Sequence, residues 1–498
     1  MHVRTRITAI VSGLVLALSP LAAQAQTLLR DSEIEGTLRD WSEPLFVAAG
    51  LEPDDIRMYL VGDRSMNAFV TGGQNIFIHS GLILEAERPN QLIGVIAHET
   101  GHISNGDLAR SSEAIQNAMV PAYITMALGV IAMVSGASEA GAALLASSQQ
   151  FAMLSFFSYT RVQESRTDQA GLSFLEATGQ SGRGLVEFFS KFRYQEVLSE
   201  ARRAPYFRSH PLSTDRITAL SRRVEEMEHK DVTDSPQDIH RFAMMQAKIY
   251  GFTFTPAQTY VRYPASDTSL PARYARAIAA YRAPDIRTAT ALTRALIEEQ
   301  PDNPWFHELL AQMLFENSRV EDSIEPGRRA VELAPDESLL HIGLARSLIA
   351  AGGEERLVEA ENHLNIALRL EPDNAFAWNQ MARVADARGL DGMARLATAE
   401  EAFALGDMPR ANRFAQAAIR NLDPGTPAWQ RATDIQSVSA RGAAAAARRG
   451  GNGGPRLVPM ASTDAARAMA SEGVTAQAMQ HDHGSHDHGS HDHAGHAH

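Results

Sequence analysis

The pattern of apolar and polar positions divides the chain into segments with different predicted structures. Residues 26–262 mix helix-like patterns, in which apolar residues recur every three or four positions, with short strand-like runs. Residues 270–436 show the helical pattern almost throughout. Residues 437–480 are rich in alanine, arginine and glycine with little periodicity, so we expect a disordered linker there. The chain is therefore predicted to be mainly α-helical, with a small β-sheet in its first domain.

A β-hairpin is predicted within the first domain. Residues 69–71 are aromatic or β-branched, Gly72 and Gly73 can form a turn, and residues 75–79 resume the strand-like pattern. His79 alternates with apolar residues in the second run, and we interpret it as structural.

The helical segment contains a repeat. Pro-Asp turns that begin at Pro301, Pro335 and Pro372 each follow one apolar helix and precede the next, at spacings of 34 and 37 residues. The longer spacing is explained by the glycine-containing loop 352–354. This period is typical of tetratricopeptide repeats, whose helix pairs stack into a solenoid with a protein-binding concave face. An ordinary helical bundle is the alternative, but it does not require phased turns.

Residues 1–25 have the pattern of a secretory signal. Arg4 and Arg6 precede the apolar residues 7–18, and residues 23–25 fit a cleavage site for signal peptidase. We therefore expect an exported mature chain. An uncleaved membrane anchor is the alternative, although the apolar core is short for a membrane span.

Composition and charge narrow the range of functions. Apolar residues make up 44% of the chain and charged residues 21%, as in ordinary globular proteins. The net charge of -13 argues against a nucleic-acid partner, which would favour a basic surface. The chain has no cysteine, so a metal site has to use histidines and carboxylates.

The strongest chemical signal is the sequence His98-Glu99-Thr100-Gly101-His102, at the end of an apolar helical pattern. Histidines four positions apart lie on one helix face, so both imidazoles can bind one metal ion. Glu99 lies beside them, where it can take a proton from a zinc-activated water. A solvated helix with two structural histidines is the alternative interpretation.

A catalytic zinc needs a third protein ligand, for which Glu164 is the best candidate. Asp168 lies one helical turn later and can accept the outer N–H of a ligand imidazole. The intervening residues 114–160 carry only one charge, on Glu139. A single membrane crossing there would separate His102 from Glu164. We therefore expect either a membrane-inserted helical hairpin or two helices lying on protein or on a membrane surface, and the small residues favour the second.

Together these motifs resemble the M48 family of zinc peptidases, which pair the same pentapeptide with a downstream Glu-x-x-x-Asp. Three further elements match that family: Asn67-Ala68-Phe69, Ser80-Gly81-Leu82-Ile83, and Ser209-His210-Pro211-Leu212 followed by Arg216. The resemblance covers about residues 45–436. With its signal and repeats the chain is similar to the periplasmic, BepA-like members. Asp107 is a departure, because members often carry a basic residue or histidine there.

The resemblance implies a zincin-like α+β metallopeptidase domain over residues 26–262 and a tetratricopeptide α-solenoid over 270–436. It implies one catalytic Zn²⁺, with His98, His102 and Glu164 as ligands and Glu99 as the base. His210 is expected at the active site, either as a donor to the developing oxyanion or as a gate on the open zinc position. Two smaller assignments follow: Arg216 supports the His210 loop or the substrate, and Asn67, Ala68 and Phe69 bind the substrate.

The implied function is endopeptidase cleavage of unfolded or stalled exported proteins, in outer-membrane protein assembly and quality control in the periplasm. The repeats would recruit the client or the assembly machinery, and residues 114–160 could contact a membrane surface. A chaperone or adaptor with a latent peptidase is the alternative. Residues 481–498 contain eight histidines, which predicts weak binding of further zinc or another transition metal, or a tail without a role.

Overall fold

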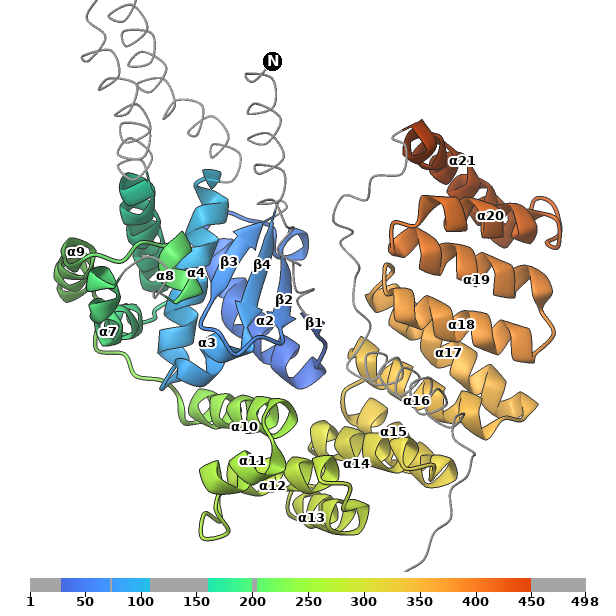
Figure 1. Ribbon diagram of the computed structural model, residues 1–498, viewed down its shortest axis with the longest axis horizontal. Coiled ribbons are helices and arrows are strands. Elements are labelled where there is room, and N and C mark those ends of the chain that lie inside the picture. The colour runs from blue at the N-terminus through green and yellow to red at the C-terminus, as the bar shows by residue number, and fades with distance from the viewer. Residues whose placement is uncertain (1–27, 72–73, 108–159, 199–203, 449–498) are drawn as a thin grey trace, which may run out of the picture.

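The computed structural model describes residues 28–71, 74–107, 160–198 and 204–448 (Figure 1). Three predicted features lie outside these residues: the signal of residues 1–25, nearly all of the apolar stretch 114–160, and the histidine-rich tail 481–498. Among the helices of the described ranges, none is both long and apolar enough to cross a membrane.

The first domain contains a four-stranded sheet in the order β1-β2-β4-β3. Its strands are β1 (Leu28–Leu29), β2 (Arg57–Val61), β3 (Ala68–Thr71) and β4 (Asn75–His79). β2 and β4 run parallel, whereas β3 pairs with β4 in the antiparallel sense, as the predicted hairpin requires. Phe69 lies opposite Phe77, and their rings stack 5.0 Å apart. Because β3 is the last strand in this order, it is an edge strand of the sheet.

Helices pack around this sheet and bury nearly all of one helix, α4 (Pro89–Ser104). They are α2 (Ser32–Ala48), α3 (Ser80–Glu85), α4 (Pro89–Ser104), the helix of residues 160–177, α7 (Arg183–Lys191), α8 (Pro205–Ser209) and α9 (Thr214–Glu225), with 3₁₀ turns at Pro53–Asp55 and Arg193–Val197. Every residue of α4 up to His102 is buried. At Gly94 a β-carbon would lie 2.9 Å from Leu185 of α7, so only glycine permits this close approach. The metal motif is thus held on a rigid central helix.

The remaining described chain is helical. Its elements are α10 (Pro236–Thr253), α11 (Pro256–Arg262), α12 (Leu270–Arg282), α13 (Ile286–Glu299), α14 (Pro304–Glu316), α15 (Val320–Leu333), α16 (Ser338–Ala351), α17 (Glu354–Leu370), α18 (Ala375–Ala387), α19 (Asp391–Ala404), α20 (Met408–Ile419) and α21 (Pro427–Arg448). From α12 onward they form successive pairs that curve around the first domain (Figure 1). The three Pro-Asp turns each connect two pairs, and Gly352 and Gly353 adopt positive φ in the loop after α16. The predicted α-solenoid is confirmed.

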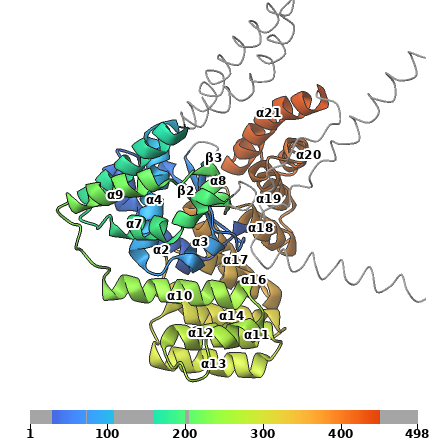
Figure 2. The ribbon, with the colours of Figure 1, turned by 60° about the vertical axis from the view of Figure 1, so that its left-hand side comes forward.

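Two boundaries differ from the sequence-based expectation. The linker predicted to begin at residue 437 is wrong up to Arg448, because α21 continues to that residue and Ser439 is fully buried. Alanine-rich sequence has high helix propensity, so it extends a helix that is already packed at Ala432 and Ile435. In addition, α10 contributes Met245 to the core of the first domain and Met244 to the core of the repeats. The two domains therefore share a helix, which Figure 2 shows between them.

A buried lysine lies where the two domains meet. Lys248 of α10 places its Nζ 2.7 Å from Asp31, 3.1 Å from Glu33 and 3.5 Å from Glu308 of α14. The Tyr274 hydroxyl donates to Glu33 at 3.0 Å. We call Lys248, Asp31, Glu33 and Glu308 the lysine cluster. It has three carboxylates for one ammonium group, so one acid is favoured in its neutral form.

This imbalance predicts that docking of the two domains weakens as the pH rises. Burial raises the pKa of Glu308, and although Lys248 opposes this effect the value reaches about 7. A raised folded-state pKa stabilises the fold fully below the ordinary value of 4.5, and the contribution is lost as the pH rises through about 7. From about pH 5.5 to about pH 8, wild type should lose roughly 2 kcal/mol of unfolding free energy relative to Glu308→Gln, which stays neutral.

Urea unfolding of both proteins at the two pH values measures this difference. Glu325→Gln, at a side chain that is 86% exposed, is the matched control and should follow wild type. Identical pH dependence of wild type and Glu308→Gln would show that Glu308 does not titrate in this range.

Candidate metal centre

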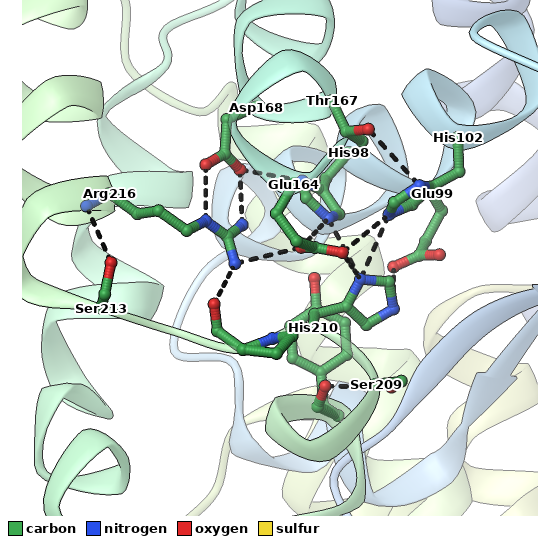
Figure 3. Close-up of polar contacts among 12 residues, drawn as sticks. His98, Glu99, His102, Glu164, Thr167, Asp168, Ser209, His210, Ser213 and Arg216 are labelled. Carbon is green, nitrogen blue, oxygen red and sulfur yellow. Dashed lines mark hydrogen bonds and ion pairs between the residues drawn. The ribbon is translucent and has the colours of Figure 1, made fainter. Parts of the chain in front are cut away.

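Four buried side chains from three parts of the chain meet beside α4 (Figure 3). His98 and His102 project from one face of α4, and Glu164 comes from the helix of residues 160–177. The Glu164 carboxylate lies 3.4 Å from Nε2 of His98 and 3.5 Å from Nε2 of His102. At Gly101 a β-carbon would lie 2.9 Å from Thr167, so this glycine allows the two helices to approach closely. The structure thus brings the three predicted ligands together.

His210 completes the group. It follows α8, and its Nδ1 lies 3.3 Å from Nε2 of His98 and 3.2 Å from Nε2 of His102. The same atom lies 3.2 Å from Glu164 Oε1. One donor atom from each of the four residues lies within 4.8 Å of the other three. Two imidazoles and a carboxylate, with room for a fourth donor, suit a divalent ion of the zinc type.

Each imidazole on α4 has its outer nitrogen against a carboxylate. Nδ1 of His98 lies 3.0 Å from Asp168, as the sequence predicted for this aspartate. Nδ1 of His102 lies 2.8 Å from Asp107, which also accepts a hydrogen bond from Thr167 at 3.2 Å. Such contacts fix the tautomer and the orientation of metal-binding histidines. The sequence showed Asp107 only as a departure from the family pattern and did not predict its contact with His102, although its position after the turn at Gly106 was the available signal.

Arg216 of α9 holds the acidic side of the site. It donates from Nε and Nη2 to Asp168, both at 2.8 Å, and its Nη1 lies 3.0 Å from Glu164. Nη1 also donates to the carbonyl oxygen of Pro211 at 2.7 Å, which fixes the loop that carries His210. The arginine was predicted to support this loop or the substrate, and in the structure it contacts the loop.

The charges in the centre are strongly coupled. Burial raises the pKa of Glu164, but the charges of His210 and Arg216 outweigh it and hold that pKa well below its usual range. Burial lowers the pKa of His98, but Asp168 and Glu164 outweigh this effect and raise it to about 10. Glu164 is therefore ionised at neutral pH, which is the form that binds a cation.

Glu99 lies beside the metal centre and has no hydrogen-bonding partner among the described residues. Its side chain is fully buried, and neither carboxylate oxygen has a partner among the described residues. Nε2 of His210 lies 3.6 Å from Oε1 of Glu99, which is beyond hydrogen-bonding distance. Buried polar atoms almost always have a partner, so Glu99 is arranged to meet a group from outside the chain, such as water or substrate.

The predicted substrate residues lie at the sheet edge beside α8. Asn67 precedes β3, whereas Ala68 and Phe69 begin it. The backbone N–H of Tyr206 in α8 donates to the carbonyl oxygen of Met66 at 3.2 Å, which joins α8 to this edge. The structure therefore places the edge strand β3 next to α8, the helix that precedes His210. His79 lies nearby, with Nδ1 3.0 Å from the Ser65 hydroxyl.

Comparisons with known proteins agree with this centre. Residues 32–224 match the model of peptidase family M48. The chain is 26% identical to the beta-barrel assembly-enhancing protease of Yersinia pestis, over 71% of this chain and 72% of that protein. It is 25% identical to the beta-barrel assembly-enhancing protease of Escherichia coli K12, over 70% of each. It is also 28% identical to the metalloprotease YcaL of Escherichia coli K12, over 34% of this chain and 63% of that protein.

Proposed function

Because residues 32–224 belong to peptidase family M48 and hold the donor set of a metalloprotease, we propose that this chain is a zinc endopeptidase acting on unfolded or stalled exported proteins. The observation that carries the proposal is the buried group of His98, His102 and Glu164 beside the unpartnered Glu99. A zinc ion held there would polarise the peptide carbonyl and lower the pKa of water to about 7. Glu99 would take the proton of the attacking water.

The edge of the sheet supplies a binding surface for an extended substrate. The His79 N–H donates to the carbonyl oxygen of Asn67, so the antiparallel alternation directs the backbone groups of Ala68 and Val70 away from β4. A client segment that pairs with these groups would form an additional strand. Phe69 would then be part of the surface along which the client is aligned. Because an added strand is recognised through its backbone, this mode favours unfolded clients of varied sequence.

His210 is proposed to gate the centre. Its Nδ1 lies about equally far from both ligand imidazoles and from Glu164, which is the place of a fourth donor. While His210 occupies that position, the attacking water cannot use it. Binding of a client or partner would favour the state in which His210 has moved away. This arrangement would restrain the protease in a compartment that contains many unfolded proteins.

The curved repeats are proposed to recruit the client or its assembly machinery. Relatives named beta-barrel assembly-enhancing protease, together with the predicted signal of residues 1–25, favour outer-membrane protein assembly in the periplasm. The tail 481–498 is proposed to bind further metal weakly. Deleting residues 270–436 would be a poor test of recruitment, since it removes Tyr274 and Glu308 from buried contacts with the first domain.

The proposed function is tested with Glu99→Gln. This variant should retain its metal and its fold but cleave unfolded outer-membrane proteins about a hundredfold or more slowly, because the base is removed. Cleavage is followed by gel electrophoresis, and assembly of the same proteins is measured in parallel. Glu85→Gln, at a side chain that is 53% exposed, is the matched control.

Two outcomes would overturn parts of this proposal. Unchanged cleavage by Glu99→Gln would remove Glu99 from the reaction. Lost cleavage with fully normal assembly would favour the alternative, a chaperone or adaptor whose peptidase is latent.

A further inference from the structure

Tyr206 has a buried hydroxyl group that the proposed mechanism does not use. It lies in the first turn of α8, four residues before His210, and its ring stacks on the His210 imidazole with centroids 4.7 Å apart and planes at 26°. The side chain is completely buried, and its hydroxyl has no hydrogen-bond partner among the described residues. A buried hydroxyl without a partner is unfavourable, so the position needs an explanation.

Packing alone does not explain this hydroxyl. The Tyr206 ring also contacts Phe207, with centroids 5.2 Å apart, and Phe189 at 6.3 Å. Phenylalanine therefore already fills the neighbouring positions of this aromatic cluster. It would fill position 206 equally well without burying a polar atom.

The surrounding charges keep the hydroxyl protonated. Burial raises the pKa of Tyr206 well above its usual value, and the negative charges of Glu99 and Glu164 raise it further. The group is therefore a hydrogen-bond donor at any pH at which the protein works. Glu99, whose carboxylate likewise has no partner, lies 3.6 Å from the imidazole on which Tyr206 stacks. Tyr206 thus has an unused donor and Glu99 an unused acceptor, and both side chains lie close to the His210 imidazole.

We propose that Tyr206 is a catalytic residue whose hydroxyl donates a hydrogen bond to the carbonyl oxygen of the scissile peptide bond as negative charge develops there. The proposal rests on the proposed peptidase function. The hydroxyl keeps its proton throughout, and no bond to Tyr206 forms or breaks. Glu99 accepts the proton of the attacking water, so the two unpartnered groups serve the two oxygen atoms of the reaction. With this role assigned to Tyr206, His210 is free to act as the gate.

Tyr206→Phe tests the proposal, because it removes only the hydroxyl and keeps the ring that stacks on His210. For the zinc-loaded full chain and an unstructured fluorogenic peptide, kcat should fall about a hundredfold while KM changes little. A phosphinic peptide, which carries the tetrahedral geometry, should bind the variant weaker by a similar factor. Zinc content should be unchanged, and the thermal unfolding midpoint should be equal or higher because an unpaired polar group is gone. Tyr250→Phe, in the stack with Phe254, is the matched control.

The outcomes separate this inference from the function on which it rests. If wild type neither cleaves the peptide nor binds the phosphinic peptide, the proposed function fails. If wild type does both and Tyr206→Phe keeps kcat and phosphinic-peptide affinity within about twofold, the role of Tyr206 is overturned and the peptidase function stands. A loss of kcat accompanied by lost zinc or a lower unfolding midpoint would show a structural role and would also overturn the proposal.

Discussion

Glu164→Gln is expected to lower zinc affinity by roughly a hundredfold or more, since replacing even the outer partners of metal ligands costs 10–100-fold. Glutamine has the same size but brings no negative charge to the ion. It also leaves Arg216, which lies 3.0 Å from the Glu164 carboxylate, with a weaker partner. Zinc is best measured by chelator competition on residues 26–480, because the histidines of the tail would otherwise contribute to the signal.

Glu99→Gln is the matched comparison for this measurement. Glu99 lies in the same pocket but is predicted to be the base rather than a ligand, so its variant should bind zinc as wild type does. Full zinc binding together with full activity in Glu164→Gln would show that the third ligand has been assigned wrongly. Zinc loss in both variants would instead show that the two carboxylates share the metal.

His210→Ala is expected to raise proteolysis of a casein-like substrate or to cause self-cleavage. Removing the imidazole opens the position that lies 3.2–3.3 Å from the nitrogens of His98 and His102. The rival role as oxyanion donor predicts the opposite sign, because losing one such donor costs about a hundredfold in rate. Hydrolysis rates of wild type and variant on the same substrate therefore separate the two roles.

The control for this experiment is His229→Ala, at a side chain that is 37% exposed and far along the chain from the metal motif. A large loss of activity in His210→Ala would refute gating and keep His210 in the reaction. Unchanged activity would make it a structural loop residue. If Tyr206 is the oxyanion donor, His210→Ala and Tyr206→Phe should change the rate in opposite directions.

The sequence was most informative where the spacing of residues determines which side chains lie on the same face of a helix or strand. His98 and His102 were paired correctly because their helical spacing alone puts them on one face. The hairpin of β3 and β4 and the helix pairs also followed from local patterns. Glu164 was the best candidate for a third ligand because Asp168 follows it one helical turn later, and the family resemblance supported that choice. The active-site role of His210 came from the resemblance, because no local rule specifies how segments separated by more than forty residues fold together.

Other features depend on tertiary packing that no local pattern reveals. Asp107 contacts His102 because the chain turns back at Gly106, whereas the sequence shows only an acidic residue at a family position that is often basic. The sharing of α10 between two cores and the lysine cluster depend on how the first domain docks into the curve of the repeats. The extension of α21 to Arg448 was missed because a composition rich in alanine and arginine indicates either a linker or a helix, and neighbouring buried residues decide between them.

The burial of the metal centre has a kinetic consequence. His98, Glu99 and Glu164 expose at most 2% of their surface, so a compact protein cannot bring a peptide bond to them. Under the proposed function, a client can be cut only while a stretch of its backbone stays extended long enough to enter. Cleavage would then compete with the client's own folding. A client that folds faster than its backbone enters the site would escape cleavage, whereas a client that stays unfolded would be cleaved. The burial of the site would therefore determine how long a client can remain unfolded before it is degraded.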